Sequence, residues 1–413
     1  MRIGQPRAWW RLPAAAALLG LAPACSAGPH PVGPAGPPGD GPLVVVSAPL
    51  TAQWWIGQFT ERGARLAVEQ LNAAPTRGRA LRLQVLDDAG SAQQAAANAR
   101  RAVAEHAAAI ITDGVGAGAV GQVTDPVGLP VFVVFQGGQS FIDAHTHPTL
   151  FRLAPANKYL TRRLADYVST KTHTAAVFGD DTSYGRDGTG PLIADLRHNA
   201  ISVVNSSVLP AGAQDVSAQV LSGRRSGAQA LLIWAGAQDV AAVLRSARGS
   251  GWQVPVYTGT TGEDPLVRQQ LADHPDWLDG TTFVSFRITT EQGPVPFNAF
   301  RSAYEHRYGP DTIGVNADGR PVVQPPDWAT YSYDAVPLIN TALTRSAGRI
   351  GPALLTAIQN VSITSANGDD RGYGPDDREG VSPSDMYFAR FHHLRFTPVT
   401  DDLLSTHLPN VAQ

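Results

Sequence analysis

The sequence predicts an α/β fold whose cores are parallel β-sheets. Short apolar runs rich in β-branched residues alternate along the chain with longer segments of helical periodicity. Several of these runs are apolar at every position, which indicates strands that are covered on both faces. The same rhythm occurs in both halves of the chain, so the predicted units are βαβ repeats that build parallel sheets.

Strands and helices follow one another from Leu43 onward. Residues 44–46 begin a buried strand, and the apolar residues between 56 and 71 mark one face of a helix. Further elements follow in order: a strand at 81–86, an alanine-rich helix at 93–106, strands at 108–111, 131–134, 175–178, 230–234 and 254–257, and a helix around 240–247. Because ligands of parallel sheets bind beyond the carboxyl ends of the strands, the loops there are the candidate binding loops.

The first 42 residues have the composition of an export signal followed by a spacer. Arginines precede the apolar stretch 14–21, and Ala22-Pro23-Ala24 is a small-residue cleavage site. We expect a signal peptide over residues 1–24, lipidation of the new N-terminal Cys25, and a Pro/Gly-rich tether over residues 25–42. The alternative is ordinary secretion with an incidental cysteine. The expected location is extracytoplasmic, anchored to the outer face of the cell membrane, or secreted if Cys25 carries no lipid.

A family resemblance extends over residues 43–360, where many short segments keep a common order and spacing. They are Ser47–Thr51, Gly57, Gly63–Ala64, Leu66–Glu69, Leu71–Asn72, Val85–Asp88, Gly128–Pro130, Phe151–Arg152, Asp181, Tyr184–Gly185, Asp215–Ser217, Arg245–Gly251, Tyr331 and Tyr333–Val336. On these residues the chain resembles type I periplasmic solute-binding proteins, in particular the branched-chain amino-acid (Leu/Ile/Val) binding family of ABC transporters. The resemblance implies two Rossmann-like lobes with parallel-sheet cores, joined by a three-strand hinge that lets them close on a ligand.

The resemblance also implies where the lobes begin and end. We expect lobe 1 to comprise residues 43–153 plus 287–373, and lobe 2 residues 154–286 plus 374–413. The three crossovers are expected near residues 151–155, 285–288 and 372–380.

The first candidate binding loop contains Asp113, Gly114 and Gly116, directly between a strand and a helix. Bare glycine backbone at a helix N-terminus presents N–H groups suited to a carboxylate. Glycines needed only for a tight turn are an equally good interpretation. A dinucleotide fingerprint is a weak one, because the third glycine is too close.

The other candidates in lobe 1 depart from the family pattern. In related amino-acid binders two hydroxyl side chains hold the ligand, and the corresponding places here are Gly116 and Gly137. Gln136 or Gln139, in the loop that begins at Phe135, would supply an amide instead. Trp54 and Trp55 precede the first helix, and we expect one of them to face the ligand while the other packs or is exposed.

Lobe 2 offers Tyr184, Trp234, Gln238, Thr261 and Glu263. The tyrosine matching Tyr184 lies over the ligand in the family, whereas the glutamate that neutralises a ligand ammonium falls at Thr261, so Glu263 or Asp264 would have to replace it. Both departures support one hypothesis: the ligand is not a plain branched-chain amino acid but an aromatic, amide-like or cationic solute.

The sequence shows none of the common hydrolase signatures, so we expect no enzyme, cofactor or metal site. A net charge of −3 gives no basic face for nucleic acid. The acidic, glycine-rich segment 367–379 is interspersed with arginines and fits a solvated loop better than a calcium site.

The expected function is capture of a small solute by a monomer and its delivery to an ABC permease complex in the membrane. One alternative is a sensory binding protein of the same fold that reports its ligand to a membrane receptor. Another is an exported enzyme on a two-lobe scaffold, because fold alone does not fix function.

Overall fold

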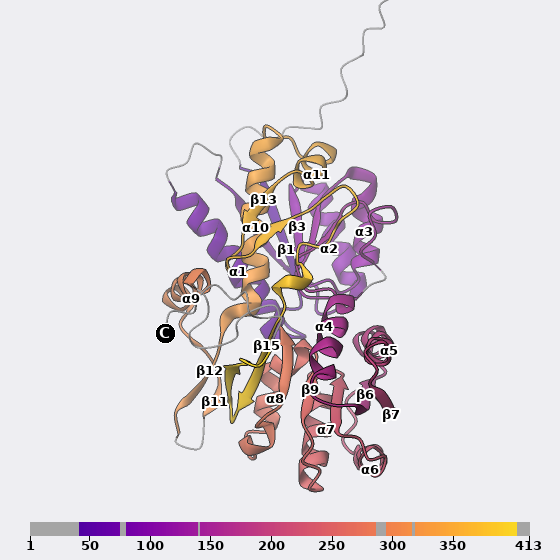
Figure 1. Cartoon of the computed structure of the whole chain (residues 1–413). Coiled ribbons are helices and arrows are strands. Elements are labelled where there is room, and N and C mark those ends of the chain that lie inside the picture. The colour runs from indigo at the N-terminus through magenta and orange to yellow at the C-terminus, as the bar shows by residue number, and fades with distance from the viewer. Residues whose placement is uncertain (1–40, 75–79, 139–140, 286–294, 316–318, 403–413) are drawn as a thin grey trace, which may run out of the picture. The chain divides into compact units, whose positions relative to one another are not determined.

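The computed structural model describes residues 41–74, 80–138, 141–285, 295–315 and 319–402. In these ranges the strands form two large sheets surrounded by helices (Figure 1). The predicted signal peptide, Cys25 and nearly all of the tether lie outside the described residues. No helix within those ranges combines the length and apolarity needed to cross a membrane.

The first sheet contains five parallel strands in the order β2-β1-β3-β4-β5. The strands are β1 (Leu43–Ala48), β2 (Arg82–Asp87), β3 (Ala109–Thr112), β4 (Val131–Val133) and β5 (Leu150–Arg152). Its helices are α1 (Trp54–Ala73), α2 (Ala92–Ala104), α3 (Ala117–Thr124), α10 (Ala329–Arg345) and α11 (Pro352–Ile358). Val44 packs in the cluster that includes Ile339 of α10, whereas Val45 packs with Ala99 of α2. Alternate side chains therefore enter cores on opposite faces, which explains the continuous apolar runs.

The second sheet has the order β16-β15-β10-β9-β8-β6-β7. Its strands are β6 (Thr174–Asp180), β7 (Ser202–Leu209), β8 (Ala230–Trp234), β9 (Val256–Thr258), β10 (Thr282–Ser285), β15 (Tyr387–His392) and β16 (Arg395–Pro398). Its helices are α4 (Asn157–Ser169), α5 (Ser183–His198), α6 (Ser217–Arg225), α7 (Ala237–Gly249) and α8 (Pro265–Gln270). Strands β6 to β10 run parallel and β15 runs antiparallel to β10. The predicted α/β fold with parallel-sheet cores is confirmed.

The chain passes between the sheets after β5, after β10, and between β14 (Asp370–Gly372), which pairs with β13 (Ser362–Thr364), and β15. The first and third passages are hydrogen-bonded to each other. The amide of Arg152 donates to the carbonyl of Arg378 at 2.8 Å, and the amide of Gly380 donates to the carbonyl of Arg152 at 2.7 Å. The second passage begins at Ser285 and continues outside the described residues, so the lobe bounds remain predictions.

One hairpin contacts elements around both sheets. It follows α9 (Val295–Tyr308) and consists of β11 (Asp311–Val315) and β12 (Pro321–Gln324). Asp311 accepts hydrogen bonds from Gln58 and Arg62 of α1, both at 2.8 Å, whereas Ile313 and Val322 pack in the core of the second sheet. The predicted bounds place this hairpin in lobe 1, whereas Ile313 and Val322 are buried in the core of the second sheet.

Candidate ligand-binding site

An aromatic cluster lies at the carboxyl edge of the first sheet. The ring centroid of Trp55, in the first turn of α1, is 5.6 Å from that of Phe135 and 5.8 Å from that of Trp328. The Phe135 and Trp328 centroids are 4.7 Å apart. Trp54 takes no part and is 53% exposed. The structure therefore brings together two of the predicted residues and a third, Trp328 of the turn η4 (Pro326–Trp328), which no pattern in the sequence connects with them.

The loop after β3 satisfies its own backbone. The Asp113 side chain is fully buried, and its Oδ1 accepts from the amide of Val115 at 3.3 Å, while the amide of Gly114 donates to Thr112 Oγ1 at 3.3 Å. Burial, together with the charge of Asp88, raises the pKa of Asp113 to about 7. The N–H groups of Gly114 and Val115 are both bonded within the loop, so this part of its backbone has partners of its own, and its contact with a ligand stays a prediction.

Backbone conformation and close contacts require glycine at positions 114 and 116. Gly114 has a φ of 109°, and a Cβ there would lie 2.7 Å from the Cβ of Gln136. Gly116 is the N-cap of α3 with a φ of 67°, and a Cβ there would lie 2.5 Å from the Cα of Ala92. Side chains other than hydrogen are excluded at both positions, which supports the tight-turn interpretation.

The loop after β4 connects these elements to the start of α4. The amide of Gln136 donates to the carbonyl of Asp113, and the amide of Asn157 donates to the carbonyl of Gly137, both at 2.8 Å. A Cβ at Gly137 would lie 2.3 Å from Asn157 Oδ1, so only glycine fits there. A Cβ at Gly138 would lie 3.0 Å from Asp187 Oδ2 of α5. Gln139, also predicted to bind ligand, lies outside the described residues.

Tyr184 and Trp234 stack on each other at the carboxyl edge of the second sheet. Their ring centroids are 5.4 Å apart and their planes differ by 18°. Trp234 is fully buried and supports the ring of Tyr184, and its contact with a ligand stays a prediction. Burial raises the pKa of Tyr184 to about 12. Thr261 is half-buried and lies beside the Tyr184 hydroxyl, whose pKa it lowers by hydrogen bonding.

Glu263 and Asp264, the expected replacements for the family's ammonium-binding glutamate, both have partners inside the protein. Glu263 is fully buried and accepts from Ser285 Oγ at 3.3 Å, and its charge acts on the buried Arg268. Asp264 caps α8 by accepting from the amide of Leu266 at 2.8 Å, and burial raises its pKa to about 7. Both carboxyl groups serve the interior of the second lobe, because the short turn after β9 folds back into its core.

Gln238 belongs to a different cavity. A pocket of about 370 Å³ lies between the loop after β7, helix α7 and the end of α8. Its lining residues are Ala213, Gln214, Asp215, Val216, Ser217, Gln238, Ala242, Arg245, Ser246 and Gln270. None of the aromatic or glycine-loop residues lines this pocket, so the structure separates Gln238 from the other candidates.

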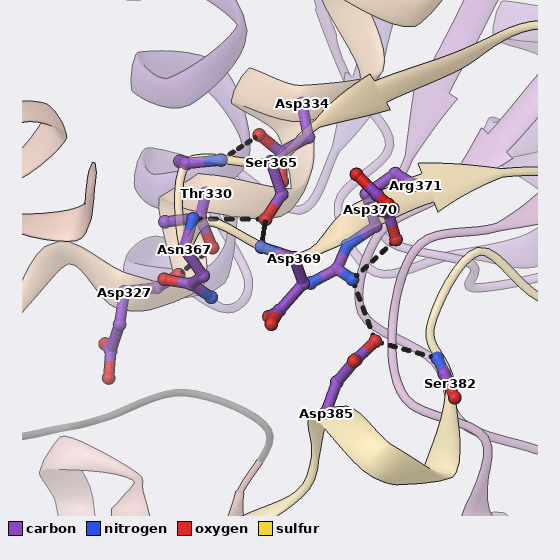
Figure 2. Close-up of polar contacts among 11 residues, drawn as sticks. Asp327, Thr330, Asp334, Ser365, Asn367, Asp369, Asp370, Arg371, Ser382 and Asp385 are labelled. Atoms are coloured by element: carbon purple, nitrogen blue, oxygen red, sulfur yellow. Dashed lines mark hydrogen bonds and ion pairs between the residues drawn. The ribbon is translucent and has the colours of Figure 1, made fainter. Parts of the chain in front are cut away.

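The acidic segment near residue 370 is a packed element, which corrects the expectation of a solvated loop (Figure 2). Arg371 is fully buried and donates to Asp385 Oδ2 at 3.0 Å, and it pairs with Asp369 at 3.4 Å. Ser365 Oγ accepts from the amides of Asn367 and Asp369 at 3.2 and 3.1 Å. The arginine thus takes the central place between the carboxylates. Elsewhere in the described chain, as here, no group of three or more acidic, histidine or cysteine side chains is arranged to hold a metal ion.

The comparisons with known proteins agree with this architecture. The family described as "Periplasmic binding protein" matches residues 49–393. A type 1 periplasmic binding protein from Bordetella pertussis Tohama I has a TM-score of 0.76 and 19% identity, covering 87% of this chain and 100% of that one. No curated protein matches the sequence.

Two further solved structures contain ligands. The branched-chain amino acid binding protein LivJ from Streptococcus pneumoniae, in complex with isoleucine, has a TM-score of 0.72 and 17% identity over 86% of this chain and 98% of that one. A solute-binding protein from Rhodopseudomonas palustris BisB5, in complex with 3,4-dihydroxybenzoic acid, has a TM-score of 0.71 and 16% identity over 87% and 96% of the two chains. The two-sheet fold and the match over residues 49–393 show that this chain belongs to the periplasmic binding protein family, with the type I fold of ABC-transporter solute-binding proteins.

Proposed function

We propose that the chain captures a small solute outside the cytoplasmic membrane by closing two lobes on it, and delivers the solute to an ABC-type importer without altering it. The observation that carries the proposal is the aromatic surface at the carboxyl edge of each sheet. Trp55 and Phe135, which pack on the buried Trp328, form it on the first sheet, and Tyr184 forms it on the second. Both edges are where parallel sheets bind ligands.

The proposal includes the anchor and the ligand type. Lipidation of Cys25 and a tether over residues 25–42 would keep the protein at the outer face of the membrane, near its permease. Ligands of similar structures range from isoleucine to 3,4-dihydroxybenzoic acid, so the fold does not name the solute. The aromatic side chains favour a ring-bearing solute over a plain branched-chain amino acid, because ring faces stack on each other.

The test is a thermal-shift screen of the purified full chain against a broad library of solutes, followed by small-angle scattering with each hit. We expect at least one solute to raise the melting temperature and to reduce the radius of gyration, because binding only the closed state shifts both. A library without any hit would overturn the proposal, and so would a hit that the protein converts to a product.

A further inference from the structure

The polar groups at the strand ends favour one class of ligand, and Asp113 is the central one. Its Oδ1 has partners inside the loop after β3, whereas its Oδ2 has no hydrogen-bond partner among the residues the structure describes. The side chain is fully buried. A buried acceptor without a donor is a place where a ligand N–H or O–H gains a hydrogen bond.

Asn157 lies at the other end of the same loop. The backbone carbonyl of Asp113 accepts a hydrogen bond from the backbone amide of Gln136. The backbone amide of Asn157 donates to the carbonyl of the residue after Gln136, Gly137. The Asn157 side chain is 1% exposed, and neither its Oδ1 nor its Nδ2 has a partner in the described part of the chain. Two unsatisfied polar side chains thus flank the loop that carries Phe135, and together they offer two acceptor oxygens and one amide donor.

The N-termini of α5 and α7 and the loop after β3, three places that could hold a ligand carboxylate, are already occupied by groups of the protein. Asp180 accepts from the amide and hydroxyl of Thr182 at the start of α5, and also from the amide of Gly236 at the start of α7. An internal carboxylate therefore occupies the positive ends of both helices. In the first sheet the amides of Gly114 and Val115 are bonded within their own loop.

The basic side chains beside these loops are engaged as well. Arg152 forms an ion pair with Glu379, and Lys158 lies 3.4 Å from the same carboxylate. Arg186 donates to the carbonyl of Asp181. A ligand carboxylate would find no uncommitted cation among these three and would meet the carboxyl group of Asp113.

We propose that the site selects a small aromatic amine or amide, a solute whose polar end donates hydrogen bonds and carries no carboxylate, with Asp113 as its principal acceptor. This inference rests on the proposed solute-binding function. It separates the chain from the similar structures that hold isoleucine or 3,4-dihydroxybenzoic acid, since both of those ligands carry a carboxylate. The aromatic ring packs against Trp55 and Phe135, and the donor group reaches Asp113 and Asn157.

The test is calorimetric titration of the full chain with five probes: benzylamine, benzamide, benzoate, 3,4-dihydroxybenzoate and isoleucine. The first three share one ring and differ only in the polar end. We expect the dissociation constant of benzylamine or benzamide to be at least tenfold below those of all three carboxylates. If any of the three carboxylates binds as tightly as benzylamine and benzamide do, the proposed ligand class is wrong, although the solute-binding function stands. If neither benzylamine nor benzamide binds, the proposed ligand class is also wrong. The thermal-shift screen of the solute library then tests the solute-binding function separately.

The role of Asp113 is tested with Asp113→Asn and the matched control Asp334→Asn, which alters another buried aspartate in α10. We expect Asp113→Asn to weaken benzylamine binding at least tenfold and to reduce its preference over benzoate, whereas Asp334→Asn leaves that preference unchanged. An unchanged preference in Asp113→Asn would remove Asp113 from the site. If that variant does not fold, the five-probe series on the natural chain still decides the ligand class.

Discussion

Arg152 and Glu379, 227 positions apart in the chain, form a buried ion pair between the first and third passages that connect the sheets. Arg152 Nε donates to Glu379 Oε2 at 2.7 Å and Nη2 donates to Oε1, so the pair is bidentate. The remaining terminal nitrogen, Nη1, donates to the carbonyls of Gln136 and Gly138 in the candidate binding loop. One side chain therefore connects the predicted hinge to the candidate binding loop.

We predict that Glu379→Gln weakens ligand binding as well as folding. Removing the carboxylate leaves the Arg152 charge buried without its counter-ion, which costs about 3–5 kcal/mol of unfolding free energy. The loop at residues 136–138 then loses its fixed position, so we expect ligand affinity to fall at least tenfold. Urea unfolding and calorimetric titration measure the two effects.

The control is Asp402→Asn, which alters the buried ion pair between Arg163 and Asp402 in the second lobe. It should lower stability by a similar amount and leave ligand affinity unchanged. Equal losses of affinity in both variants would show that the hinge pair has no special connection to the site.

Trp55 should report ligand binding and Trp54 should not. Trp55 packs against Phe135 and Trp328, whereas the neighbouring Trp54 is 53% exposed. Fluorescence of an indole changes when its surroundings change, so we expect Trp55→Phe to remove most of the ligand-induced signal. Trp54→Phe is the matched control and should retain it. Retention of the full signal in Trp55→Phe would place the ligand away from the aromatic cluster.

Gly114→Ala should be strongly destabilising, unlike Gly118→Ala four residues later. The φ of 109° and the 2.7 Å approach to Gln136 at Gly114 cost about 2 kcal/mol or more with an added methyl group. Gly118 is in helix α3, and its Cβ would lie 3.8 Å from the nearest atom, His147 Nε2. Alanine there should be neutral or stabilise by up to about 1 kcal/mol, because it is the better helix former. Similar melting temperatures for the two variants would contradict the described loop.

Stability should fall as the pH rises from about 4 to about 7 because of buried carboxyl groups. Burial raises the pKa of Asp334 to about 7 and that of Asp369, beside Arg371 and Asp385, to about 6, from 3.8. The folded chain therefore holds protons that the unfolded chain has lost in this window. Each group reduces the unfolding free energy by up to about 1.4 kcal/mol per pH unit until the pH passes its folded pKa.

Asp334→Asn should flatten this dependence, because the amide is neutral at every pH. Chemical unfolding of both proteins at several pH values measures the slopes. The exposed Asp276 provides the control: Asp276→Asn should keep the natural slope. If Asp334→Asn and the natural chain lose stability in parallel, Asp334 does not hold a proton in the folded state.

The sequence predicted several strands whose side chains are buried on both faces, although it missed the fully buried β10. The run at residues 230–234 coincides with β8, and the runs at 108–111 and 131–134 lie within one residue of β3 and β4. The edge strand β7 was not predicted, because Val204 and Val208 are 38% and 62% exposed and its pattern does not separate an apolar face from a polar one. Hydrophobic periodicity follows burial, so it does not predict a strand such as β7, whose apolar residues are exposed.

For the site, the sequence placed Trp55, Phe135, Asp113 and Tyr184 at strand ends, but it did not indicate Trp328 or Asn157. Trp328 joins the cluster only because α10 packs on the same face of the sheet as α1. The side-chain amide of Asn157 is a candidate ligand contact because it has no hydrogen-bond partner among the described residues. The sequence does not show this, because the neighbours of Asn157 come from distant parts of the chain.

The sequence by itself determined the two parallel-sheet cores and the strand-end loops, because burial and backbone geometry are written locally in apolar runs and glycines. The tertiary structure decided which polar groups in those loops remain free for a ligand. Asp180 satisfies Gly236, 56 positions away, and Asp88 binds Ser47, 41 positions away. Such pairings depend on which distant segments fold together, so only the folded chain distinguishes an acceptor that is already used from one that awaits a ligand.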